Sequence, residues 1–165
     1  MLSSPLELFI CPSGPGASSY AACFGRGDMF VSPDAGDGTF FRNSRVRLRD
    51  IEDGPMTILV GERPGAHWSG VSPLPATGKP GSQGMALSSR ARVLAHTGPL
   101  SPGKPVHLPS RALGCMADFG SAHRNGTNFL LVDGSVRFLS EQLDPAIFSA
   151  LATRAGGEFV NQTEF

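Results

Sequence analysis

The residues best suited to chemistry are a histidine and an aspartate in the C-terminal half of the chain. His123 is followed by nine residues and then by Asp133 and Gly134. Imidazole and carboxylate groups are the usual agents of proton transfer and metal binding. An extended chain rises by roughly 3.3 Å per residue, so this spacing can hold the two groups about 30 Å apart. We therefore expect structural roles: His123 hydrogen-bonds main-chain groups or a nearby carboxylate, and Asp133 holds a turn.

Other acidic side chains could supply ligands for an ion. The weak candidates for a metal site are Asp118, His123, Asp133 and Glu62, and oxygen-rich loops suit calcium. The chain carries no dense array of alternating aspartates. Loop capping is therefore the expected role of Asp118, and an ion pair with an arginine is expected for Glu62. We expect no cofactor, with calcium as the alternative.

A histidine and the sole tryptophan stand side by side in a glycine-rich stretch. An exposed indole ring at Trp68, next to His67, could stack on a sugar or a peptide. This pair is the candidate ligand-binding site of a cell-surface or periplasmic binding module for carbohydrate or a small solute. The more ordinary interpretation gives His67 a surface position and Trp68 a place in a small satellite core.

Signatures of catalysis are missing from the sequence. Nucleophilic catalysis requires a nucleophile within hydrogen-bond reach of a base, and no serine lies in a Gly-x-Ser-x-Gly turn. Cys11, Cys23 and Cys115 match no metal-binding spacing. The closeness of Cys115 to His123 in sequence does not make a catalytic pair. We expect a protein that is not an enzyme, and a hydrolase ranks last among the functions considered.

Composition bounds the fold and the partners. The chain has 165 residues, of which 40% are hydrophobic, enough for one domain with a core. Its 14 basic and 14 acidic residues cancel, so no net field attracts nucleic acid or an anionic membrane. The 21 glycines and 14 prolines favour short strands and turns. We predict a single loop-rich α+β domain over residues 1–165, built on an antiparallel sheet.

A β-hairpin is the clearest element. Residues 127–132 and 135–139 flank Asp133-Gly134, a pair typical of the two-residue type I′ turn. That turn places Val132 opposite Ser135. Counting back from this pair, one buried face should carry Phe129, Leu131, Val136 and Phe138.

A short helix should follow the hairpin. Asp144 is a good N-cap, Pro145 suits the first helical position, and Gly156-Gly157 supplies a stop after Arg154.

Upstream of the hairpin, Thr57 to Val60 should form a strand inside the sheet. Residues 63–116 are rich in proline, glycine and serine, which predicts long loops with a short helix or extra hairpin near Met85 to Leu94.

Five landmarks in one order give the chain a family resemblance. They are Phe9-Ile-Cys-Pro-Ser13, Ser19-Tyr-Ala21, Asp50 to Gly54 leading into Thr57 to Arg63, His123 with Asp133-Gly134, and Ala150 to Glu158. The chain resembles the prepilin-type, processing-associated domain named for its histidine, nine residues and Asp-Gly. The motif residues carried over as structural are His123, Asn128, Asp133, Gly134 and Ser135.

The resemblance implies a pseudopilin-like globular domain made with a prepilin leader and a long apolar N-terminal helix. A peptidase trims the leader, and the helix anchors or polymerises the protein, as in type II secretion. No such helix follows Met1. On this basis we expect an exported structural or assembly component, periplasmic or at the cell surface. Its partners would be other pseudopilin-like or secretion-system subunits, with membrane contact only through that missing helix.

Overall fold

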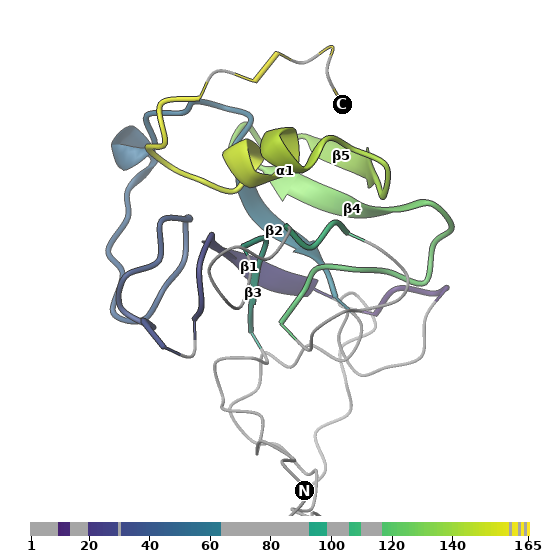
Figure 1. The fold of residues 1–165 in the computed structure, drawn as a ribbon, viewed down its shortest axis with the longest axis horizontal. Helices are drawn as coiled ribbons and strands as arrows, with labels where there is room; N and C mark the ends of the chain where they lie inside the picture. Colours follow the sequence, from purple (N-terminus) through teal and green to yellow (C-terminus); the bar gives the residue numbers. More distant parts are fainter. Residues whose placement is uncertain are drawn as a thin grey trace, which may run out of the picture.

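Five short strands form one mixed sheet (Figure 1). The computed structural model describes residues 10–13, 20–29, 31–63, 93–98, 106–109, 117–158, 160, 161, 163 and 165. The strand order is β3-β1-β2-β4-β5, with β1 and β3 parallel and the other neighbours antiparallel. The strands are β1 (Tyr20–Gly25), β2 (Ile58–Glu62), β3 (Leu94–His96), β4 (Gly126–Leu131) and β5 (Val136–Ser140).

The described helices are the 3₁₀ turn η2 (Leu48–Asp50) and α1 (Pro145–Leu151), and none of them is long and apolar enough to cross a membrane. A sheet with one short C-terminal α-helix fits the α+β class expected from the sequence. The sheet is mixed and not purely antiparallel, because β3 runs parallel to β1. The predicted strand at Thr57 to Val60 is confirmed as β2, in the centre of the sheet.

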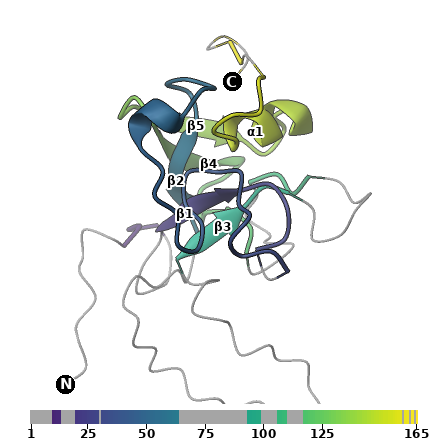
Figure 2. The ribbon, with the colours of Figure 1, turned by 90° about the vertical axis from the view of Figure 1, so that its left-hand side faces the viewer.

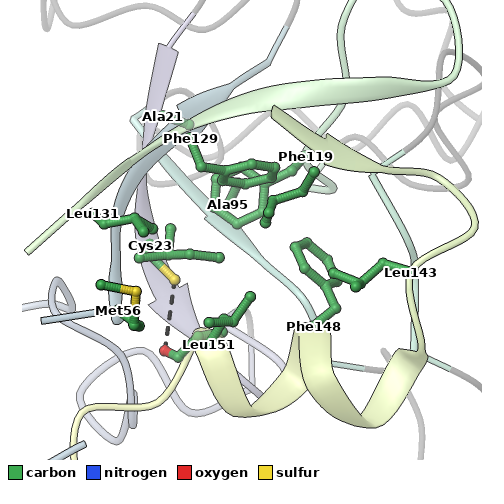
Figure 3. Packing of buried hydrophobic residues seen from close by; sticks show 13 residues of the cluster. Ala21, Cys23, Met56, Ala95, Phe119, Phe129, Leu131, Leu143, Phe148 and Leu151 are labelled. Atoms are coloured by element: carbon green, nitrogen blue, oxygen red, sulfur yellow. Dashed lines mark hydrogen bonds between the residues drawn. The ribbon is translucent and has the colours of Figure 1, made fainter. Parts of the chain in front are cut away.

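The core lies between α1 and one face of the sheet (Figures 1 and 2). Three phenylalanine rings meet edge to face there, with centroids 5.1 Å apart for Phe119 and Phe129 and 5.7 Å apart for Phe129 and Phe148. Figure 3 shows these rings with Leu131, Leu143 and Leu151 around them. Such edge-to-face pairs stabilise a core beyond the area they bury.

Helix α1 begins where the sequence predicts and ends earlier. The Asp144 carboxylate accepts a hydrogen bond from the Ala146 N–H at 2.7 Å, and Pro145 is the first helical residue. The helix ends at Leu151 and not near Arg154. The residues after it bond to other parts of the chain, since the Arg154 N–H donates to the Asp37 carbonyl and the Thr153 hydroxyl donates to Asp53.

The hairpin is present, but its predicted register is wrong by one residue. Asn128 pairs with Phe138 and Phe129 with Arg137. The Gly134 N–H donates to the Leu131 carbonyl and the Leu131 N–H donates to the Ser135 carbonyl, which closes a three-residue loop over 132–134. This is a type I turn followed by a left-handed glycine, the other turn that Asp-Gly permits.

The register decides which side chains of β5 are buried. Shifting a strand by one residue exchanges its two faces. Leu139 is 1% exposed and joins the core, whereas Val136 is 66% exposed and Phe138 49% exposed. Phe129 and Leu131 are buried as predicted. The predicted burial of Val136 and Phe138 is therefore wrong.

Gly134 still has the left-handed backbone that its turn requires, with φ of +83° and open space around its Cβ position. Strain alone should decide which substitutions it tolerates. We expect Gly134→Val to lower the denaturation midpoint clearly more than Gly134→Asn, because asparagine adopts positive φ more readily than a β-branched residue. Equal midpoints for the two purified variants would show that positive φ at this position is not required.

Candidate functional site

The face of the sheet opposite α1 carries a buried carboxylate, that of Glu62 at the end of β2. Its neighbour Gly61 faces the core against Phe129, so Glu62 points the other way. Tyr20 of β1 lies directly opposite Glu62. Glu62 is only 3% exposed, and a buried carboxylate must find partners to offset its desolvation.

Two residues hold the Glu62 carboxylate. The backbone N–H and the side-chain amide of Asn128 both donate to Oε2, at 2.8 and 3.1 Å. Oε1 lies 3.2 Å from Nε2 of His123. The expectation that Glu62 pairs with an arginine is wrong, because β4 brings Asn128 beside it and the segment entering β4 brings His123.

His123 is fixed by the turn that leads into β4. Its N–H donates to the Ser121 hydroxyl at 3.0 Å, and that hydroxyl donates to the Gly126 carbonyl at 2.8 Å. Asn125 adopts a left-handed φ of 67° within the turn. These bonds place the imidazole over the end of β2, so its contact is with a carboxylate, one of the two kinds of partner expected from the sequence.

Cys11 completes the cluster. Its Sγ lies 3.4 Å from Nε2 of His123, and the residue is 5% exposed. Cys11, Glu62 and His123 each offer one atom that could bind a metal, and these three atoms all lie within 4.8 Å of one another. Sequence reasoning missed this cysteine, because 112 positions separate it from His123 and no spacing rule links them.

The geometry of the cluster does not resemble a catalytic triad. In a triad the imidazole bridges, with the nucleophile on one ring nitrogen and the orienting group on the other. Here Cys11 Sγ and Glu62 Oε1 both approach the same nitrogen, Nε2. His123 therefore cannot pass a proton between them from one nitrogen to the other. The arrangement instead presents sulfur, oxygen and nitrogen donors toward a common centre.

Tyr20 borders the cluster on the β1 side. Burial raises the pKa of its phenol, and the nearby charges of Glu62 and Cys11 act in the same direction. The phenol therefore stays neutral near pH 7. Cys23, by contrast, lies in the core, where its Sγ contacts the Ala152 carbonyl (Figure 3) and burial raises its pKa to about 12. Such a thiol is inert.

The remaining predicted site residues lie elsewhere. Asp133 follows β4 while His123 precedes it, so the six-residue strand separates them. Asp133 holds its turn as expected, accepting from the Ser135 N–H at 2.8 Å. Asp118 does not join Glu62; its carboxylate contacts Nδ1 of His107 at 2.8 Å. His67, Trp68 and Cys115 lie outside the described residues, as do 85–92 of the predicted helix or hairpin.

A second polar group surrounds His96, at the end of β3. His96 is fully buried, its ring centroid is 6.4 Å from that of His107, and its backbone bridges to Asp118. Burial lowers the pKa of His96, while Asp118 and the Gly98 backbone act in the opposite direction. The imidazole is therefore neutral in the folded protein near pH 7.

Acidification should destabilise the fold through His96. Because its pKa is lower in the folded state, the unfolded chain takes up the proton first as the pH falls through about 6.5. The free energy of unfolding should decrease from there until the folded pKa is passed. Urea denaturation of the parent and of His96→Gln over this pH range measures the effect. The free energy of unfolding of the variant should depend less steeply on pH. Identical slopes would rule out His96 as the source.

Comparison with known proteins returns one family. A family model described as "Protein of unknown function (DUF1559)" matches residues 2–146. No curated protein and no solved structure matches the chain.

Proposed function

Since the chain belongs to the DUF1559 family of proteins of unknown function, whose model covers residues 2–146, we propose that it is an exported, pseudopilin-like assembly subunit and not an enzyme. The prepilin-type resemblance supports this. Its landmarks fall on the elements that build the sheet: His123 leads into β4, Asp133-Gly134 turns from β4 to β5, and one landmark contains β2.

The observation that carries the proposal is an apolar strip along edge strand β5. The strip consists of Val136 and Phe138, which are exposed, with the half-buried Leu130 and Val60 beside them on the same face. Isolated proteins usually protect sheet edges with charges, prolines or bulges. An exposed apolar strip at a sheet edge is suited to contact with another protein chain.

A neighbouring subunit of the same kind is the occupant that this strip suits. Among the described residues β5 has no strand on its outer side, so its main chain can still pair. The absence of net charge gives no steering toward nucleic acid or an anionic membrane. Packing of Phe138 against an apolar partner would then supply most of the contact energy.

The non-catalytic part of the proposal is supported by the two described thiols. Cys23 is buried with a raised pKa. Cys11 and Glu62 share one nitrogen of His123, which excludes a relay through the imidazole. The carboxylate of Glu62 is also held by Asn128 and is not free to serve as a mobile base.

Processing and location of the natural protein test the proposal. We expect the protein extracted from its native cells to fractionate with the envelope. Mass spectrometry of its N-terminal peptide should show that a prepilin-type peptidase has removed a leader and that the mature protein begins with an apolar segment. Cells lacking that peptidase should accumulate the uncut form. Recovery in the soluble cytoplasmic fraction, with an uncut N-terminus in both strains, would contradict the proposal.

A further inference from the structure

We propose that Cys11, Glu62 and His123 form a binding site for a divalent transition metal of the zinc class. The inference is independent of the proposed function, because it rests only on the geometry of these three side chains. They come from three distant segments of the chain, so a bound ion would tie residues 10–13 to the sheet.

The distances fit a tetrahedral ion. With bonds of roughly 2.0 to 2.3 Å, ligand atoms at the corners of a zinc tetrahedron lie about 3.3 to 3.8 Å apart. His123 Nε2 lies 3.4 Å from Cys11 Sγ and 3.2 Å from Glu62 Oε1. The third pair, a Glu62 carboxylate oxygen and Cys11 Sγ, lies within 4.8 Å. Both distances from His123 Nε2 are thus close to those between zinc ligands.

A hydrogen bond at Nε2 can join His123 to only one of its two neighbours in the cluster. Nε2 carries either one proton or one lone pair. If it carries a proton, the proton can point well at Glu62 Oε1 or at Cys11 Sγ but not at both. If it carries a lone pair, that lone pair faces a carboxylate oxygen. A cation at the centre accepts all three donors at once, as thiolate, imidazole lone pair and carboxylate oxygen.

The surroundings orient the ligands as metal sites require. Asn128 binds only Oε2 of Glu62, which leaves Oε1 aimed at the centre. Ser121 fixes the backbone of His123. Such supporting bonds are typical of protein metal sites and tune their affinity. The His123 side chain is 32% exposed, so solvent reaches part of the imidazole, and water would serve as the fourth ligand.

The donor set selects the metal. Thiolate and imidazole ligands suit zinc and its neighbours, whereas calcium takes oxygen ligands. The calcium site considered from the sequence would have needed Asp118 and Asp133 beside Glu62, and the structure places both elsewhere.

Cobalt and zinc titrations of the full chain, stripped of metal with a chelator, test the site. We expect about one ion bound per chain, as one three-ligand site allows. Cobalt should give the near-ultraviolet thiolate-to-metal band and the visible bands of tetrahedral coordination. Zinc should raise the melting temperature, because it binds the folded state preferentially.

Matched variants locate the ion. Cys11→Ser should abolish the thiolate band and His123→Gln should abolish tight binding, while Cys115→Ser, the same change at another cysteine, should retain both. Asn128→Ala should weaken zinc binding about 10- to 100-fold. Circular dichroism confirms that each variant folds. The proposal is overturned if the parent shows no thiolate band, a result that depends on no variant, or if folded Cys11→Ser binds zinc as the parent does.

Discussion

Replacing Leu139 by alanine is expected to lower the free energy of unfolding by about 2 to 5 kcal/mol. Leu139 is 1% exposed and packs in the main core, so its removal leaves a cavity. Its neighbour Phe138 is the larger side chain but is 49% exposed. Phe138→Ala should therefore cost no more than about 1 kcal/mol, as surface substitutions usually do.

Urea denaturation of the two variants measures this difference. It tests the hairpin register, because the alternative two-residue turn would bury Phe138 in place of Leu139. A greater loss for Phe138→Ala than for Leu139→Ala would mean that β5 pairs in that alternative register. Some loss at Phe138 is expected in any case, since its ring lies against Gly126 on the neighbouring strand.

Phe129→Ala should lower the free energy of unfolding by about 3 to 5 kcal/mol. Phe129 is 1% exposed and contacts the rings of both Phe119 and Phe148 edge to face. It also closes over Gly61, where an added Cβ would lie 2.4 Å from its ring and 2.6 Å from that of Phe119. The Phe129 ring is thus packed between Gly61 and the rings of Phe119 and Phe148.

A double-mutant cycle with Gly61→Ala makes this prediction specific. Gly61→Ala alone should destabilise by roughly 1 to 3 kcal/mol, because the extra methyl group overpacks the rings. In the Phe129→Ala background the same change should cost much less, since the cavity accepts the methyl group. Additive effects of the two substitutions would show that Phe129 does not pack over Gly61.

The sequence predicted the elements whose signals are local. The cap at Asp144 and Pro145 and the apolar run of β2 depend on neighbouring residues, and both are confirmed. The hairpin register was not predictable in the same way. Asp133-Gly134 permits a two-residue turn or a three-residue loop with glycine left-handed, and Phe138 and Leu139 are both apolar enough for the core. In the folded chain Leu139 joins the core that includes Phe148 and Leu151, and Phe138 stays half exposed.

The candidate site shows a similar division. Glu62 and His123 are both among the four metal-ligand candidates from the sequence, but no spacing rule predicts that these two, of the four, lie together. Their meeting depends on the pairing of β2 with β4, which brings Asn128 beside Glu62. Cys11 is joined to them only by the folded chain. Asp118 and Asp133, which looked equally suitable, lie in separate local contacts.

The central claim, assembly through the apolar strip of β5, is tested most directly by photo-crosslinking in native cells. A benzoyl-phenylalanine replaces Phe138 in one strain and Val31 in a control strain; Val31 is 77% exposed and lies outside the sheet. Crosslinking from position 138 should give adducts with the mass of two or more pilin-like subunits, and position 31 should give none. Assembly through this strip would be contradicted if both positions gave only uncrosslinked monomer, or if both gave the same adducts.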